Sequence, residues 1–202
     1  MKQFILLWKT RHLGDIASVL GSFAMGTFHL VIVLMHPSML PLLYMFFCYL
    51  LSASRLVEYF LMRKEKRRFA ELFGAISILV LTVPLVLSMV FTILKRRSVE
   101  YPFYWMIFAY AFYAFLKIGT ALYNLFKKGK RPVRATPYLS LVGALYTMFM
   151  MQDAMLNAYG EAGEFAYLMR LYSQGAVFLV SLFLASLLFI RFLRAKEIDA
   201  AS

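Results

Sequence analysis

The 202-residue chain has little of what a folded soluble domain needs. Only 10 of its residues are acidic, and no segment between its apolar stretches is long enough to fold separately. The single cysteine, Cys48, excludes an intramolecular disulfide and leaves the redox compartment open. Asn124 and Asn157 both lack the hydroxyl residue of an Asn-x-Ser/Thr site, so the sequence has no acceptor for N-glycosylation. That absence mildly favours the inner membrane of a bacterium as the location.

Recognisable catalytic motifs are also missing. There is no G-x-S-x-G nucleophile turn, no Walker-type phosphate loop and no H-E-x-x-H zinc motif. The sequence therefore gives no support to a hydrolase, a nucleotidase or a metalloprotease, and we expect neither a cofactor nor a bound metal. Whether the chain is an enzyme stays open, with the balance against it.

What the chain has instead is apolar length. It is 62% hydrophobic, with a mean hydropathy of +0.72. A bilayer core about 30 Å thick needs about 20 apolar residues of helix, and backbone polar groups in lipid must be satisfied within the segment. We therefore predict an all-α, polytopic membrane helix bundle that forms one integral membrane domain over 1–202. Its six transmembrane helices are expected at 13–36, 39–62, 70–94, 101–126, 136–158 and 165–190, with an interfacial stub at 1–12 and a cytoplasmic tail at 191–202.

The distribution of positive charge predicts the orientation. Of the 22 Lys and Arg residues, sixteen fall on the side that holds both termini, four fall on the other side and two lie inside spans. By the positive-inside rule, both termini of this multi-pass cell-membrane protein are cytoplasmic. The four outer residues are Lys95, Arg96, Arg97 and Arg170.

The same charge predicts the partners. Basic segments next to a membrane attract anionic lipid head groups, so we expect lipids as partners; a homo-oligomer or a membrane-protein partner would also fit. Nucleic acid is not expected, because no soluble binding module accompanies the charge.

A weak repeat at a spacing of 64 residues suggests three tandem helical hairpins. Six identities occur between 44–68 and 108–132. A duplicated hairpin explains them, and so does the general requirement that helices ending in the cytoplasm finish in Tyr and Lys or Arg. The matched residues of the first copy are Tyr49, Tyr59, Leu61, Lys64, Lys66 and Arg67.

Polar residues recur on one face of several spans. Ser22 and His29 share a face of the first span, and Tyr113, Lys117 and Asn124 share a face of the fourth. Such faces should avoid lipid tails and converge inside the bundle. They either hydrogen-bond the helices together, at roughly 0.6 kcal/mol per bond, or line a hydrated path.

Lys117 is the sharpest candidate for function. It lies ten residues from Lys127, about 15 Å along the helix and near the midplane. An unpaired ammonium there would cost at least about 2.5–3.5 kcal/mol, so it needs a partner, a water-filled pocket, or to be neutral. Glu58, about 7 Å shallower, is the expected partner. Arg55 precedes Glu58 by three residues and either snorkels or pairs with it.

A second polar group is expected toward the outer side. Two histidines seven residues apart share a helix face, and with carboxylates they could bind a metal or pass protons. The spacing matches no established ligand motif, so a hydrogen-bonding role is the plainer interpretation. The residues that could gather there are His29, His36, Asp153, Glu161 and Glu164.

Three functions fit these patterns. The leading hypothesis is a small transporter or channel-like subunit with a polar intramembrane site around Lys117. The first alternative is a non-catalytic membrane scaffold or regulatory subunit, and the second is an intramembrane lipid-modifying enzyme that uses His29, His36 and Asp153. The residues expected along the substrate or ion path are Lys117, Glu58, Arg55, Asn124, Tyr113, Ser22, His29 and Asp153.

Overall fold

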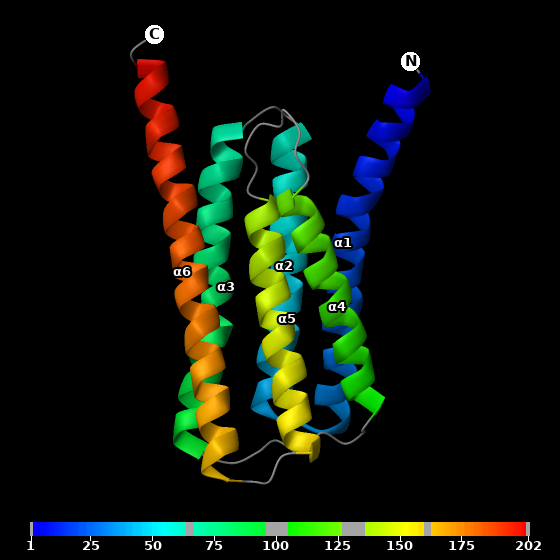
Figure 1. The fold of residues 1–202 in the computed structure, drawn as a ribbon, viewed down its shortest axis with the longest axis vertical. Coiled ribbons are helices and arrows are strands. Elements are labelled where there is room, and N and C mark those ends of the chain that lie inside the picture. Colours follow the sequence, from blue (N-terminus) through cyan, green and yellow to red (C-terminus); the bar gives the residue numbers. More distant parts are fainter. Residues whose placement is uncertain (1, 64–66, 96–104, 127–135, 160–162, 201–202) are drawn as a thin grey trace.

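Six α-helices stand side by side, with no strand in the part of the chain that is described (Figure 1). The computed structural model describes residues 2–63, 67–95, 105–126, 136–159 and 163–200. The all-α membrane helix bundle predicted from the sequence is confirmed. The helices are α1 (Lys2–Met35), α2 (Met39–Arg63), α3 (Arg67–Lys95), α4 (Trp105–Phe126), α5 (Thr136–Tyr159) and α6 (Glu164–Ala200).

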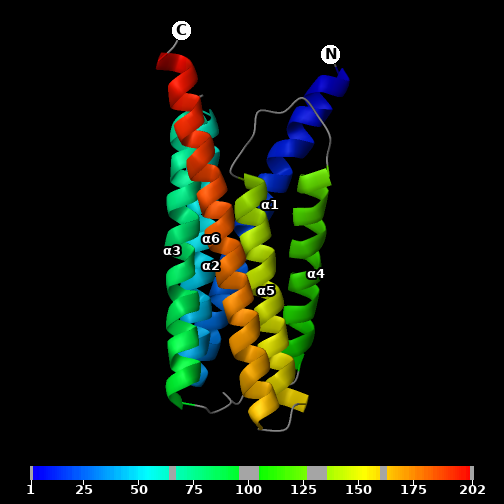
Figure 2. The same ribbon diagram turned by 60° about the vertical axis from the view of Figure 1, so that its left-hand side comes forward.

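Length and composition make this an integral membrane protein. Five helices contain a stretch long and apolar enough to cross a bilayer. The described apolar stretch of α4, Ile107–Leu122, is shorter. The whole of α4 has 22 residues, or about 33 Å of helix, and it runs alongside α5 (Figure 2). The five spans are Ser18–Met35, Met39–Leu61, Phe69–Leu94, Thr136–Tyr159 and Glu164–Arg194.

Proline positions account for several helix ends. Pro37 lies in the three-residue joint between α1 and α2, and Pro41 is the third residue of α2. Pro137 is the second residue of α5. Proline has no backbone N–H to donate and fits the first turn of a helix, where that donor has no intrahelical partner.

The two terminal helices extend beyond the predicted spans. α1 continues without a break from Lys2 through the region expected as an interfacial stub, and α6 continues past residue 190 to Ala200. The interfacial position of residues 1–12 stays a prediction. Both chain ends lie at the same end of the bundle (Figures 1 and 2), as an even number of crossings requires.

The helices pack in a pattern that the chain order alone does not give. α2 lies near α1, α3 and α5, whereas α4 packs on α5 and α3 packs on α6. The chain runs out and back three times, but α3 and α4 make no close backbone contact among the described residues. The middle pair is therefore not a packed hairpin, and the most extensive packing joins α1 with α2, α4 with α5, and α3 with α6.

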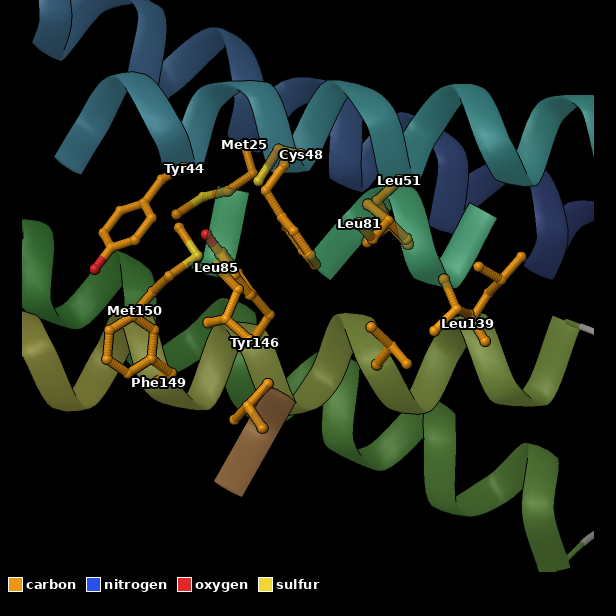
Figure 3. Packing of buried hydrophobic residues seen from close by; sticks show 14 of the residues in the cluster. Met25, Tyr44, Cys48, Leu51, Leu81, Leu85, Leu139, Tyr146, Phe149 and Met150 are labelled. Atoms are coloured by element: carbon orange, nitrogen blue, oxygen red, sulfur yellow. The ribbon is translucent and has the colours of Figure 1, made fainter. Parts of the chain in front are cut away.

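The core lies between α2 and α5 (Figure 3). The rings of Phe47 and Tyr146 stack, with centroids 3.5 Å apart and planes 7° from parallel. One helical turn below Tyr146, Gly143 lets Leu51 approach so closely that a Cβ at residue 143 would lie 2.8 Å from Leu51 Cδ2. Close packing and small residues, rather than the hydrophobic effect, hold helices together in lipid.

The outer surface of the bundle is apolar, as lipid requires. On α4 the exposed positions include Phe108, Phe112 and Phe115, at 72%, 68% and 68% of their full surface. Their spacing of four and three residues puts them on one face of the helix. The buried polar side chains of α4, Tyr110 and Lys117, lie on its inner side.

Candidate functional site

Lys117 lies in the middle of α4, twelve residues from its first residue and nine from its last. Its side chain is buried, with 5% of its surface exposed. The ammonium Nζ donates to Oγ of Ser22 on α1 at 2.7 Å and approaches the carbonyl oxygen of Ser18 at 3.4 Å. It also lies 5.1 Å from the ring centroid of Tyr113, one turn away on α4. Lys117 is therefore packed against protein rather than lipid.

The Ser22 hydroxyl joins this group together. Ser22 is fully buried and donates its proton to the carbonyl oxygen of Ser18, 3.0 Å away. Its oxygen then has two lone pairs to accept with. It accepts from Lys117 and, at 3.4 Å, from the hydroxyl of Tyr113. We call these four residues, Ser18, Ser22, Tyr113 and Lys117, the Lys117 centre.

The Lys117 centre is formed by long side chains of α4 that reach across to α1, because the backbones of these two helices do not come close to each other. No Cα atom of α1 lies within 8 Å of one in α4 among the described residues. Side chains of the length of lysine and tyrosine are needed to bridge that separation. Small residues on α1 and long ones on α4 therefore complement each other across the interface.

The expected ion pair between Lys117 and Glu58 does not form. Within the described residues no carboxylate lies within 4.0 Å of Lys117 Nζ. Glu58 is buried and accepts a hydrogen bond from the Thr136 hydroxyl of α5 at 2.7 Å. The reason lies in the packing: α4 has α5 as its neighbour and makes no close backbone contact with α2 among the described residues.

Arg55 and Glu58 belong to a second polar group, nearer the end of the bundle that holds the termini. Nη2 of Arg55 donates to Oγ of Ser140 on α5 at 3.1 Å. Thr136, four residues before Ser140, donates to Glu58. Glu71, on α3, is also buried. Charged groups of α2 are thus held by hydroxyls of α5.

A third polar group lies at the opposite end, around Asp153 on α5. Its Oδ1 forms an ion pair with Nε of Arg170 on α6, 2.7 Å away. The Nε–H bond does not point at Oδ1, so this contact is an ion pair without a hydrogen bond. Its Oδ2 accepts from the Tyr44 hydroxyl of α2 at 3.0 Å. Arg170 also donates through Nη2 to Oδ1 of Asn157. The group ties three helices together through one buried carboxylate.

His29 lies between the Lys117 centre and the Asp153 group. Its Nδ1 lies 2.8 Å from the Met25 carbonyl oxygen, which can only accept, so Nδ1 carries the proton. In the neutral ring Nε2 then accepts from the Tyr110 hydroxyl, 3.0 Å away. The His29 ring meets the Tyr44 ring edge-on, with centroids 5.7 Å apart. With both nitrogens engaged, the His29 ring is held in one orientation.

The remaining residues of the predicted outer group do not join it. His36 and Glu164 are exposed, and Glu161 lies outside the described residues. Tyr44 stands between His29 and Asp153. In the described part of the chain no three residues among His, Cys, Asp and Glu are placed to hold a metal ion. The side chain of Asn124, predicted on the path, also falls outside the described residues.

Sequence reasoning missed two important residues. Arg170 was counted among the outer charges although it lies five residues inside the predicted sixth span, and that position was the available signal. It is buried, with 7% of its surface exposed. Tyr146 was not singled out, yet it is fully buried at the core and its hydroxyl has no hydrogen-bond partner within the described residues.

Comparison of the chain with protein-family models, with curated proteins and with solved structures finds no match in any of the three. The fold and these buried polar groups therefore define the class of protein, a helical integral membrane protein, and carry the functional argument from here.

Proposed function

We propose that this protein is a small transporter or channel-like subunit that acts on a solute at the Lys117 centre. One observation carries the proposal: an ammonium buried halfway along α4 has neutral oxygens and an aromatic ring as its partners. A charge at that depth is costly. Purely structural positions rarely tolerate it without a carboxylate partner, whereas transporters commonly place solute-binding groups near the midplane.

The three polar groups are distributed in a way that suits a path across the membrane. The Arg55 group lies toward the end that holds the termini, the Lys117 centre lies in the middle, and the Asp153 group lies toward the other end. The Arg55 and Asp153 groups each join α2 to α5, and the Lys117 centre joins α1 to α4. A solute or ion that crosses between these helices would meet hydrogen-bonding groups at each level.

For orientation, we propose that the end with both termini faces the cytoplasm, because the count of charges along the sequence assigns sixteen of the 22 positive residues to that side. A bacterial inner membrane fits best. The same basic face would attract anionic lipid head groups, and association with a second copy or with another membrane protein is compatible with it.

The enzyme alternative has the least support. A lipid-modifying site built on His29 and Asp153 would need free atoms on both, but the two His29 nitrogens are engaged by Met25 and Tyr110. Asp153 is held by Arg170 and Tyr44. The scaffold alternative predicts no solute flux that depends on Lys117. The transport experiment below therefore distinguishes it from the leading proposal.

The experiment reconstitutes the purified chain into liposomes and follows swelling in isotonic glycerol, potassium chloride with valinomycin, and sodium nitrate. We expect flux of at least one solute above that of protein-free liposomes. Lys117→Met should lower this flux by about tenfold or more, which corresponds to one lost charge-assisted contact. Phe112→Leu, on the exposed face of the same helix, is the matched control and should leave the flux unchanged.

Two results would count against transport. One is a correctly folded protein that moves none of these solutes. The other is an equal flux through the wild type and Lys117→Met. Either result would favour the scaffold, in which the polar residues only join helices.

A further inference from the structure

The boundary between α1 and α4 is packed differently from the other boundaries of these two helices. Among the described residues, α1 makes close backbone contact only with α2, and α4 only with α5. Where α1 meets α2, a Cβ on Gly26 would lie 3.0 Å from the Tyr49 ring, so a small residue and a large one fit closely together. Where α1 meets α4, side chains reach across a wider gap, as Lys117 does to Ser22. Helices in lipid are held together mainly by close packing of small residues, and the α1–α4 boundary lacks that packing.

Helix geometry divides the buried side of α4 between its two neighbours. Ala114 and Ala121 are almost completely buried although their side chains are short, which requires a backbone nearby, and that backbone is α5. At about 100° of rotation per residue, Lys117 lies next to the alanines on the side of α1. Tyr113 lies farther round in the same direction, between Lys117 and the exposed Leu116. Tyr113 therefore borders the face of α4 that lipid covers.

The Tyr113 ring separates the Lys117 ammonium from the bilayer. The ring is partly exposed, and its centroid lies 5.1 Å from Lys117 Nζ. Opposite the ring, α1 carries Gly21, which offers no side chain; a Cβ there would only come within 3.9 Å of Tyr113 Cε2. One long hydrogen bond, 3.4 Å to Ser22 Oγ, holds the tyrosine hydroxyl. A rotation of the Tyr113 side chain toward the lipid would therefore open a direct way from the bilayer to Lys117.

Lys117 has a donor available for a ligand. An ammonium has three N–H donors, and among the described residues those of Lys117 have two oxygen acceptors, Ser22 Oγ and the Ser18 carbonyl. The remaining neighbour is the Tyr113 ring, which a hydrogen-bond acceptor could replace. A molecule that reaches this depth through hydrocarbon must be uncharged, because a charge there is costly. An uncharged acceptor on an apolar body is typical of a carbonyl compound such as a ketone or a quinone.

We infer that the α1–α4 boundary is a lateral portal gated by Tyr113, through which an uncharged, lipid-soluble carbonyl compound enters from the bilayer and accepts a hydrogen bond from Lys117 Nζ. The displaced tyrosine ring leaves room for one six-membered ring. This ligand goes beyond the proposed function, because it comes from the lipid rather than from either aqueous side. It would compete with a transported solute for the same ammonium.

The test uses benzophenone, an uncharged aromatic ketone that dissolves in lipid and bonds to nearby C–H groups under ultraviolet light. The full-length protein in phosphatidylcholine nanodiscs is irradiated at increasing benzophenone concentration, and mass spectrometry locates the labelled residues. We expect saturable labelling around Ser22 and Tyr113, whereas labelling of the lipid-exposed Phe112 should rise in proportion to concentration. Dicyclohexyl ketone should compete at the saturable site. Dicyclohexylmethane, which lacks only the carbonyl oxygen, should not.

Four variants separate the ligand contact from the portal. Lys117→Met should lower the saturable labelling about tenfold, because the charged donor is lost. Tyr113→Phe removes the hydrogen bond that holds the ring and keeps the ring itself, so labelling should rise about twofold or more. Gly21→Phe places a ring between the helices and should lower it. Gly119→Phe is the matched control: nothing lies within 4 Å of a Cβ there, and labelling should not change.

The inference fails if labelling around Ser22 and Tyr113 does not saturate, if dicyclohexylmethane competes as well as the ketone, or if Gly21→Phe labels as Gly119→Phe does. A fall in Tyr113→Phe would overturn the gating role. The comparison of the two glycines stands even if Lys117→Met does not fold. Saturable, Lys117-dependent labelling without flux of any solute would overturn the proposed transport and keep the portal. Lys117-dependent flux without saturable labelling would do the reverse.

Discussion

Arg170 of α6 and Asp153 of α5 form a buried ion pair, with Nε and Oδ1 2.7 Å apart and less than a tenth of either side chain exposed. The pair joins two helices that follow each other in the chain, and Tyr44 attaches α2 to it. In lipid no water is present to solvate either charge when its partner is removed. The pair should therefore behave as one unit in stability measurements.

Asp153→Asn leaves the Arg170 guanidinium buried without a carboxylate, and Arg170→Met leaves the Asp153 carboxylate with the Tyr44 hydroxyl. Each change should lower the free energy of unfolding by about 3–5 kcal/mol. The double variant removes both charges and should lose less than the sum of the single losses. The measurement is unfolding in mixed micelles with SDS as denaturant.

Met155→Leu, on the exposed side of α5, is the control for this cycle and should shift stability by no more than about 0.5 kcal/mol. Strictly additive losses in the double variant would contradict the pairing.

Tyr110→Phe tests the hydrogen bond to His29. The change leaves Nε2 of a fully buried His29 without the donor that now lies 3.0 Å away. An unmet buried acceptor costs about 1–3 kcal/mol, so the free energy of unfolding should fall by that amount. His29→Leu combined with Tyr110→Phe should cost less than the two single changes added together. Full additivity would mean that the two side chains do not interact.

Much of this arrangement could be predicted from the sequence. The six apolar stretches and their order follow from the requirement that backbone groups in lipid be satisfied within a helix. The depth of Lys117, ten residues from Lys127, predicted a buried amine, and its 5% exposure agrees. The stripe containing Ser22 and His29 predicted an inner face for α1, and both residues are fully buried.

What the sequence could not give is which helices are neighbours. Lys117 had a carboxylate at a suitable depth, Glu58, but the nearest side chain across the interface is Ser22 of α1. Depth along a helix follows from counting residues, whereas partner choice depends on how helices are placed around one another. Arg170 was missed for a related reason. A count of charges assigns each residue to one side of the membrane and does not consider which other side chains it contacts.

The two glycines Gly143 and Gly175 make a matched pair of helix-interior positions. A Cβ at residue 143 would lie 2.8 Å from Leu51 Cδ2, whereas nothing lies within 4 Å of a Cβ at residue 175. Gly143→Ala should therefore destabilise the protein by about 1–3 kcal/mol through overpacking. Gly175→Ala should stabilise it by up to about 1 kcal/mol, because alanine favours the helix. SDS unfolding curves of the two variants measure both effects.

Leu51→Val should relieve part of the Gly143→Ala cost, because it shortens the side chain that the new methyl group meets. A Gly143→Ala variant as stable as the wild type, or no relief in the double variant, would show that α2 and α5 do not pack this closely.

Cys48, the one native cysteine, is buried. Because it should not react with a thiol reagent, cysteines introduced elsewhere can be used to map the orientation. Pro37→Cys places a thiol in the joint between α1 and α2, and Arg194→Cys places one near the end of α6, at the opposite end of the bundle; both native side chains are exposed. If the basic end is cytoplasmic, a membrane-impermeant maleimide added to intact cells should label Pro37→Cys and spare Arg194→Cys. Detergent permeabilisation should make both react, while the wild type stays unlabelled. The reverse pattern in intact cells would place the termini outside and remove the charge argument for the proposed orientation.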